Sequence, residues 1–413
     1  MPESLLRRRR YAPVWLMGLS NATFGLVGGF IVLPLPQMLA AEGVSEAKIA
    51  AVSAACLSPG FWVFLLGPVL DVRFSRRWYA SFFAALSGMG LMAAVLMRGH
   101  LLVLEILLML GYASAVMSSN ALGGWLASIV RQEDEAKLSA WTQVAVFLGN
   151  GLMAGLAAEG LRALPLRVIG PLLGALAVLP AAVFPWMPMP EERLQVGEDG
   201  QVGAVLRERF RDLFRDLGSL LKRREILLTL ALFVLPTGSF ALTNLLGGVA
   251  KEFHASDAFV SRMGGAVLSV AGAASCLLLP VLARRVRALP LYLLIGTTGS
   301  LFTLGLLVLP RTSWTFALAF LGENMVQALS FTAAVAICFR IIGRGNPLSG
   351  TIFSLLTSVT VAPIVYMGVL DGRAFTRHGV TGVYLFDGGV SLLACATMAV
   401  VMRRWAGSLE LAH

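Results

Sequence analysis

The architecture follows from Gly67-Pro68-Val69-Leu70-Asp71-Val72-Arg73-Phe74-Ser75-Arg76-Arg77, a short basic stretch between two long apolar segments. These segments cover residues 46–70 and 78–97, and each is long enough to cross the ~30 Å hydrocarbon core of a bilayer as a helix. Arginines are costly inside hydrocarbon, so the stretch must be a loop at a membrane face. Its acidic residue, followed by three arginines, also predicts a charge-paired contact at that face.

The composition extends this conclusion to the whole chain. Of the 413 residues, 57% are hydrophobic and 14% are charged, whereas about 25% are charged in a typical soluble protein. Backbone polar groups in lipid must be satisfied within the segment, and the apolar runs are too long for the strands of a membrane barrel. We therefore expect an all-α polytopic membrane protein.

Apolar runs separated by polar residues predict twelve transmembrane helices. They cover residues 12–40, 46–70, 78–97, 100–129, 138–161, 165–187, 226–250, 257–283, 289–309, 312–341, 347–370 and 379–402. The first run is too long for the apolar region of a signal peptide, so we expect it to be an uncleaved span. Lysines and arginines are concentrated in the loops on the side of Arg73, Arg76 and Arg77, which predicts that this side and both termini are cytoplasmic.

The net charge of +10 does not indicate nucleic-acid binding, because the arginines lie in short loops beside apolar helices. All four cysteines fall inside apolar runs without metal-ligand spacing, which predicts neither disulfides nor a metal site. The sequence contains no catalytic or nucleotide-binding motif. We therefore expect no enzymatic activity, no cofactor, no nucleic-acid partner and a monomer in the bilayer.

The two halves of the chain repeat each other. Residues 67–71 are echoed by Leu279-Pro280-Val281-Leu282-Ala283, an offset of 212, and arginines follow both. Three further short matches, at residues 138–140, 159–160 and 44–46, recur in the same order at offsets of 210 to 212. This predicts a 6+6 parallel repeat related by a pseudo-two-fold axis. The expected domains are an N-terminal six-helix bundle (1–187), a cytoplasmic linker with an amphipathic helix (188–225) and a C-terminal six-helix bundle (226–413).

Ionisable residues inside a span are candidate functional sites, because each costs about 3 kcal/mol or more at the bilayer centre. Glu323 lies near the middle of its span, with Asn324 and Gln327 on or near its helix face. Its carboxyl group either binds the coupling proton or the solute in a central cavity, or forms a structural hydrogen bond between helices. Glu105 lies close to the end of its span, and Tyr112 occupies the position that the repeat matches to Glu323.

Other charged residues in the spans have a structural interpretation. We expect Asp387, beside Gly388 and Gly389, to serve helix packing. Glu159 and Asp371, each followed by glycine at a span end, are expected in solvated turns at the outer face. Uncharged polar residues recur in the matching spans and either pack helices or line a cavity, among them Asn21, Asn120 and Asn244.

The twelve spans, the internal duplication and the long central loop resemble the major facilitator superfamily. Gly67 and Asp71, followed by Arg73, Arg76 and Arg77, look like the loop signature of that superfamily, in which this group latches the cytoplasmic side. Residues 42–45, 67–71 and 346–356 are similar to the AmpG-type permeases, a group that includes acetyl-CoA transporters and siderophore importers.

The resemblance implies solute transport at a bacterial inner membrane by alternating access. It also implies that Asn21, Tyr112, Asn120, Asn244, Glu323 and Gln327 lie near the substrate. We expect a proton-coupled importer of an amphiphilic solute, such as a muropeptide-like glycopeptide or a siderophore. An efflux pump of the same fold and a non-transporting membrane sensor or scaffold are the alternatives.

Overall fold

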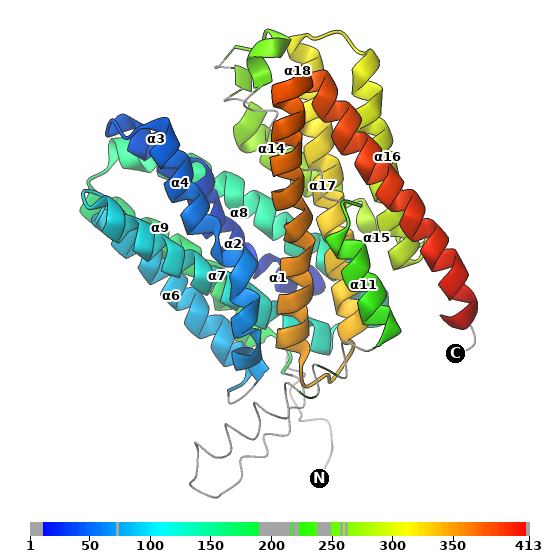
Figure 1. Cartoon of the computed structure of the whole chain (residues 1–413). Helices are drawn as coiled ribbons and strands as arrows, with labels where there is room; N and C mark the ends of the chain where they lie inside the picture. Colours follow the sequence, from blue (N-terminus) through cyan, green and yellow to red (C-terminus); the bar gives the residue numbers. More distant parts are fainter. Residues whose placement is uncertain are drawn as a thin grey trace, which may run out of the picture.

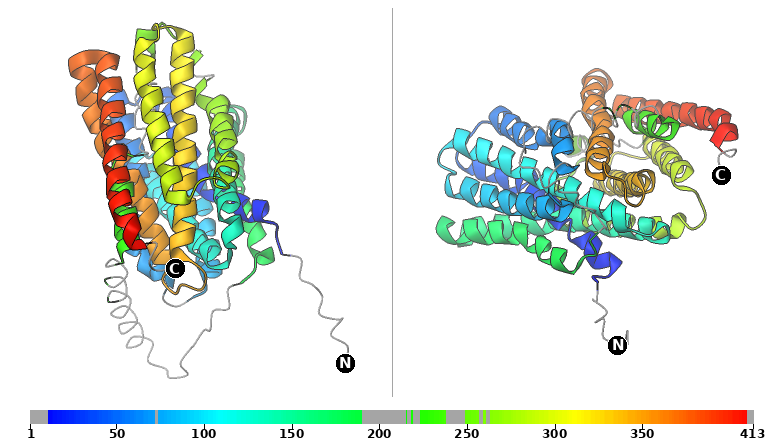
Figure 2. Two further views of the ribbon diagram at one scale, coloured as in Figure 1. Left: turned by 90° about the vertical axis from the view of Figure 1, so that its right-hand side faces the viewer. Right: turned by 90° about the horizontal axis from the view of Figure 1, so that it is seen from below.

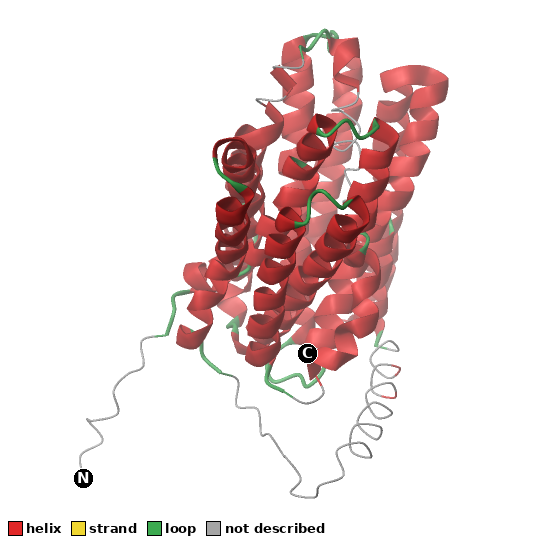
Figure 3. Ribbon diagram, turned by 90° about the vertical axis from the view of Figure 1, so that its left-hand side faces the viewer, coloured by secondary structure: helices red, strands yellow, loops and turns green. Residues whose placement is uncertain are grey.

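A computed structural model describes residues 11–71, 74–189, 215, 218, 223–237, 249–256, 259–260 and 263–409 of the chain. These residues form helices and connecting loops, and they contain no β-strand (Figure 3). The predicted all-α membrane protein is therefore confirmed. The linker predicted over residues 188–225 lies almost entirely outside the described residues.

The first half of the chain forms one bundle, in which prolines divide several spans into shorter helices. Pro34 and Pro59 each stand at the first position of a helix, where the missing N–H costs no hydrogen bond. The elements are α1 (Val14–Leu19), α2 (Ala22–Val32), α3 (Pro34–Ala41), α4 (Glu46–Leu57), α5 (Pro59–Trp62), η2 (Val63–Asp71), α6 (Arg76–Leu96), α7 (Leu101–Ile129), η3 (Gln132–Asp134), α8 (Glu135–Ala163), α9 (Leu166–Val178) and η4 (Leu179–Trp186).

The second half forms a second bundle beside the first (Figures 1 and 2). Its described elements are α11 (Arg224–Val234), η5 (Ala250–Phe253), η6 (Met263–Val267), α14 (Leu268–Cys276), α15 (Leu279–Leu282), α16 (Ala288–Gly305), η7 (Leu306–Val308), α17 (Ser313–Ile342) and α18 (Ser349–Leu409). Gly379, at φ 61° and ψ −157°, is non-helical and divides α18 into two arms. The arms run in opposite directions in Figure 1, so α18 crosses the membrane twice.

The observed helices agree with the predicted spans. Ten described ranges are long and apolar enough to cross a membrane, and the range Ser349–Arg404 contains both arms of α18. Helix α11 begins within two residues of the predicted seventh span, whose remainder is partly outside the described residues. The structure is thus consistent with twelve spans, while the proposed domain boundaries remain predictions.

The two bundles lie close together at the end that carries the termini and lean apart toward the other end (Figure 1). Near the termini, η2 and α7 of the first bundle pack against α18 of the second. Helix α8 of the first bundle packs against α14 and α17. The arrangement is closed at the face that the arginine distribution predicts to be cytoplasmic.

Glycines permit the closest of these approaches. A Cβ atom added at Gly124 of α7 would lie 2.6 Å from the backbone nitrogen of Gly350 in α18. The neighbouring Gly123 faces the ring of Phe353, which a Cβ atom would meet at 2.2 Å. Since real Cβ atoms do not approach backbone this closely, any side chain at Gly124 must push α7 and α18 apart.

We predict that Gly124→Ala opens the termini-side contact, because overpacking at a rigid backbone contact costs about 1–3 kcal/mol. The measurement is cysteine alkylation or spin-label distances across that face in purified protein. Gly155→Ala in α8 is the matched control, since a Cβ atom there meets nothing within 4 Å. Equal behaviour of the two variants would show that this contact does not hold the face closed.

Candidate functional site

Asp71 ends the helix η2, and its fully buried carboxylate reaches across to the second half of the chain. It accepts hydrogen bonds from the backbone N–H groups of Gly350 (3.1 Å) and Thr351 (2.7 Å), and from the Thr351 hydroxyl (2.8 Å). These groups belong to the first turn of α18, where free N–H groups and the positive end of the helix dipole favour an anion. The carboxylate of one half therefore caps a helix of the other.

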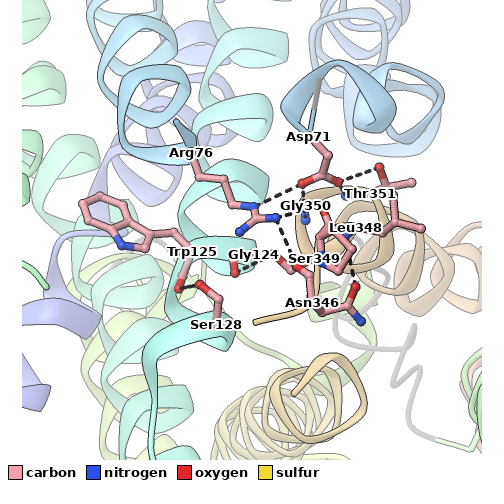
Figure 4. A network of polar contacts seen from close by, with 11 residues as sticks. Asp71, Arg76, Gly124, Trp125, Ser128, Asn346, Leu348, Ser349, Gly350 and Thr351 are labelled. Atoms are coloured by element: carbon pink, nitrogen blue, oxygen red, sulfur yellow. Dashed lines mark hydrogen bonds and ion pairs between the residues drawn. The ribbon is translucent and has the colours of Figure 1, made fainter. Parts of the chain in front are cut away.

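Arg76 completes this contact from the first position of α6 (Figure 4). Its Nε donates to Asp71 at 3.1 Å, and its Nη2 donates to the carbonyls of Asn346 (3.1 Å) and Pro347 (2.8 Å). The side chain is 7% exposed, so its charge is compensated by these partners rather than by water. We call Asp71 and Arg76, with residues 346–351, the latch.

Further hydrogen bonds between the halves surround the latch. The Ser349 hydroxyl donates to the Gly124 carbonyl (2.9 Å), and the Asn120 amide donates to the Ser354 hydroxyl (2.9 Å). Gly67 allows η2 to approach, since a Cβ atom there would lie 3.1 Å from the Cβ of Ser354. Polar groups from α7 and η2 thus hold the beginning of α18 along two turns.

The predicted latch residues have different positions in the structure. Gly67, Asp71 and Arg76 lie at the contact between the halves. Arg77 is partly buried, and its side chain forms no hydrogen bond or ion pair with any described residue, while Arg73 lies outside the described residues. Their role in controlling access remains a prediction.

Glu323 lies in the interior of the second bundle, at a central position of α17, and is fully buried. Its carboxyl accepts a hydrogen bond from the Thr303 hydroxyl of α16. Asp387 and Asp371 of α18 lie close enough to act on its charge. The described partners of Glu323 all belong to the second half, so the structure does not place it at the boundary between the halves.

The expectation of a solvated turn at Asp371 is wrong, because this residue is 0% exposed. Helix α18 continues two turns beyond it to the break at Gly379, so Asp371 lies within the helix rather than at its end. Asp371 and Asp387 each stand eight residues from Gly379, and the helical hairpin brings them to the same level. Glu159 is exposed, as expected, and pairs with Arg162 at 3.9 Å.

Glu323, Asp371 and Asp387 form a buried group that we call the carboxyl cluster. Among the described residues, no hydrogen-bond partner is found for Glu323 Oε2, both carboxyl oxygens of Asp371, Asp387 Oδ1 or the hydroxyl of nearby Tyr384. Arg311 acts electrostatically on Tyr384 but pairs with Glu252 at 3.1 Å. Burying several unpaired carboxylates is costly, so protons or another cation must compensate them.

Asn324 has neighbours different from those of Glu323. A Cβ atom added at Gly272 of α14 would lie 3.0 Å from the Asn324 side-chain oxygen and 2.7 Å from the Phe147 ring of α8. Asn324 therefore points toward the boundary between the halves, and Gln327 is also buried. The sequence prediction placed Glu323 and Asn324 together, but their side chains point to different neighbours.

The remaining predicted residues do not converge on Glu323. The Tyr112 ring lies 5.7 Å from that of Phe24, within the first bundle. Asn21 is buried at the break between α1 and α2, and Glu105 is partly buried in α7. Asn244 lies outside the described residues.

The comparisons with known proteins agree with this geometry. The family model described as "Major Facilitator Superfamily" matches residues 16–367. The chain belongs to the Major Facilitator Superfamily. Members of this family are transporters, and the sequence matches none of the curated proteins significantly.

Solved structures of transporters share the fold. The human organic anion transporter MFSD10 (TETRAN) is similar with a TM-score of 0.67 at 17% identity, covering 96% of this chain and 100% of that one. The proton:xylose symporter XylE gives a TM-score of 0.67 at 16% identity, over 93% and 94% of the two chains. A bacterial homologue of the iron transporter ferroportin, in an outward-facing state, gives a TM-score of 0.60 at 15% identity, covering 95% of this chain and 98% of that one. At these identities the likeness establishes the fold.

Sequence reasoning did not identify Thr303, Thr351 and Ser354 as partners of the predicted charges. Hydroxyls are common in membrane helices, and nothing in their spacing marks these three. The sequence could have shown that Asp371 and Asp387 lie at the same height in the two arms of α18, because both are eight residues from Gly379. This inference requires knowing that the helix breaks at Gly379.

We predict that Asp71→Asn destabilises the closed termini-side face by about 3 kcal/mol, because it leaves Arg76 buried without its counterion. Spin-label distances across that face measure the shift, and solute selectivity should not change. Asp134→Asn is the control, since the 2.9 Å Asp134–Lys137 pair is solvent-exposed and worth less than about 1 kcal/mol. Altered selectivity in Asp71→Asn would contradict a purely conformational role.

Proposed function

We propose that this protein is a proton-coupled secondary transporter of the bacterial inner membrane that imports an amphiphilic solute by alternating access. A muropeptide-like glycopeptide and a siderophore are the proposed solute classes. The carboxyl cluster formed by Glu323, Asp371 and Asp387 binds the coupling proton. The latch keeps the cytoplasmic face closed while the opposite face admits the solute.

The burial of three carboxyl groups without a described cationic partner carries this proposal. Their mutual repulsion makes the fully charged cluster unfavourable in the low-dielectric interior of the bundle. A bound proton removes one charge and supplies a donor for a neighbouring carboxyl oxygen that has no partner. Proton binding and release therefore change the energy of the packing among α16, α17 and both arms of α18.

The asymmetry between the two ends of the molecule supports alternating access. Charged hydrogen bonds join the halves at the termini side, whereas the bundles lean apart at the other end (Figure 1). A transporter in this conformation exposes its solute path to the side opposite the termini. Breaking the latch would allow the halves to rotate into the opposite arrangement.

The polar groups near the boundary between the halves support an amphiphilic solute. Asn120 and Ser354 contribute an amide and a hydroxyl, and Asn324 contributes an amide oxygen that has no described partner. The aromatic ring of Phe147 lies close to Asn324. Such neighbours suit a solute with amide or hydroxyl groups and an apolar part better than an inorganic ion.

We predict that Glu323→Gln abolishes accumulation of solute driven by a proton gradient, because the amide cannot take up and release the coupling proton. Uptake into proteoliposomes with an imposed pH gradient measures this loss. Exchange of labelled solute without a gradient should persist, since it requires binding and rocking but no net proton movement.

Glu159→Gln is the matched control, because Glu159 is exposed and remote from the cluster. Undiminished gradient-driven accumulation by Glu323→Gln would overturn the assignment of this residue. Gradient-driven extrusion of solute by the unmodified protein would identify an efflux pump. Absence of both uptake and exchange in the unmodified protein, for muropeptides and siderophores alike, would overturn the proposed solute classes.

A further inference from the structure

The second half of the chain contains the counterpart of the latch loop, but without its carboxylate. Ala283 stands at the position that the repeat matches to Asp71, and Arg284, Arg285 and Arg287 follow it. In the first half, the Asp71 carboxylate joins an arginine to a helix of the other half. In the second half, arginines follow the matching position, but an alanine stands where the first half has its carboxylate.

A cavity of about 440 Å³ lies between this loop and the first half. The first half contributes the start of α8, and the second half contributes α15, the start of α16 and the end of α17. The charged lining consists of five cations and two anions, namely Arg284, Arg285, Arg287, Arg340, Lys137, Glu133 and Glu135. The lining therefore carries an excess of positive charge.

The two glutamates that line the cavity do not balance its five cations. Glu135 acts electrostatically on Arg340, and Lys137 pairs with Asp134 at 2.9 Å. Arg284 and Arg285 are exposed and line the cavity, and their guanidinium groups form no ion pair or hydrogen bond with a described residue. Two guanidinium groups thus remain available to an external anion, for which their planar fork suits a phosphate group.

The cavity also has an apolar side that continues to the lipid-facing surface. Leu279, Pro280 and Val286 line it, and the adjoining side chains of Leu278 and Val281 are 49% and 60% exposed. On a membrane protein, such exposed apolar side chains face acyl chains. Cations beside an apolar surface at the end of a span match a lipid with an anionic headgroup better than a fully water-soluble anion.

We propose that this cavity binds the phosphate headgroup of an anionic phospholipid, which takes the place in the second half that Asp71 occupies in the first. The arginine distribution predicts that this face is cytoplasmic, where anionic lipids are concentrated. Residues of both halves line the cavity, so the lipid bridges them. Binding therefore stabilises the conformation in which this face is closed.

The experiment measures retention of phosphatidylglycerol by the full-length protein, using native mass spectrometry of detergent-solubilised samples titrated with this lipid. We expect the double variant Arg284→Gln/Arg285→Gln to bind it about 30-fold more weakly, since each arginine near an anionic headgroup contributes about fivefold. Arg403→Gln/Arg404→Gln is the matched control, because it removes two adjacent exposed arginines that do not line the cavity.

A second variant tests the proposal from the opposite direction. Ala283→Asp supplies an internal carboxylate at the repeat position of Asp71, and we expect it to reduce lipid retention while keeping the face closed. Equal lipid loss in the control variant would overturn the site, because it would indicate diffuse surface charge. Equal retention of phosphatidylcholine would also overturn it. Displacement of the lipid by an equal concentration of inorganic phosphate would identify a soluble anion as the ligand and contradict the lipid assignment.

Discussion

The hydrogen bonds that the buried Asp71 carboxylate accepts from the first turn of α18 hold the two halves together at one face. A carboxylate without partners in this position would cost several kcal/mol, so the backbone donors, the Thr351 hydroxyl and Arg76 must be in place together. This requirement makes the contact cooperative, so we expect it to be either formed or broken. A cooperative contact between two rigid bundles is what a two-state gate needs.

Helix α18 connects this contact to the carboxyl cluster. Its first arm begins at the latch with Gly350 and Thr351 and carries Asp371 about 30 Å further along the helix. Its second arm returns Asp387 to the level of Asp371. Both charged sites therefore contact the same helical hairpin, and we expect a change of charge at one site to alter the packing of the element that the other site holds. We regard this shared hairpin as the physical basis for linking proton binding to access.

The two halves of the internal repeat differ in their charged residues. The first half contains its own anion for the latch, whereas the second half has Ala283 at the matching position and the cluster of carboxyl groups in its interior. In the mechanism that we propose, one bundle contributes the latch carboxylate and the other contributes the groups that bind the proton. This division of roles accounts for the different charged residues of the two halves.

Much of the fold could be predicted from the sequence, because lipid imposes a length and an apolar composition on each span. The contact at Asp71 could also be anticipated, since an acidic residue beside arginines at a membrane face requires a partner. The arrangement of polar residues in the interior of the second bundle could not be predicted from the sequence. Asp371 was misplaced because its helix continues past a charged residue and a glycine to Gly379, and helix ends are poorly marked by hydropathy when a buried carboxyl interrupts the pattern. The different orientations of Glu323 and Asn324 depend on the rotation of α17, which packing with α14 and α16 determines.

In the proposed mechanism, transport requires the halves to separate at the latch. The variant Gly67→Cys/Ser354→Cys places two cysteines within reach of a disulfide, because a Cβ atom at Gly67 lies 3.1 Å from that of Ser354. Uptake of labelled solute is then measured in proteoliposomes after oxidation and again after reduction, with each single cysteine variant as control. We expect oxidation to stop uptake in the double variant alone and reduction to restore it. Undiminished uptake by the cross-linked protein would show that transport does not require the halves to separate at the latch.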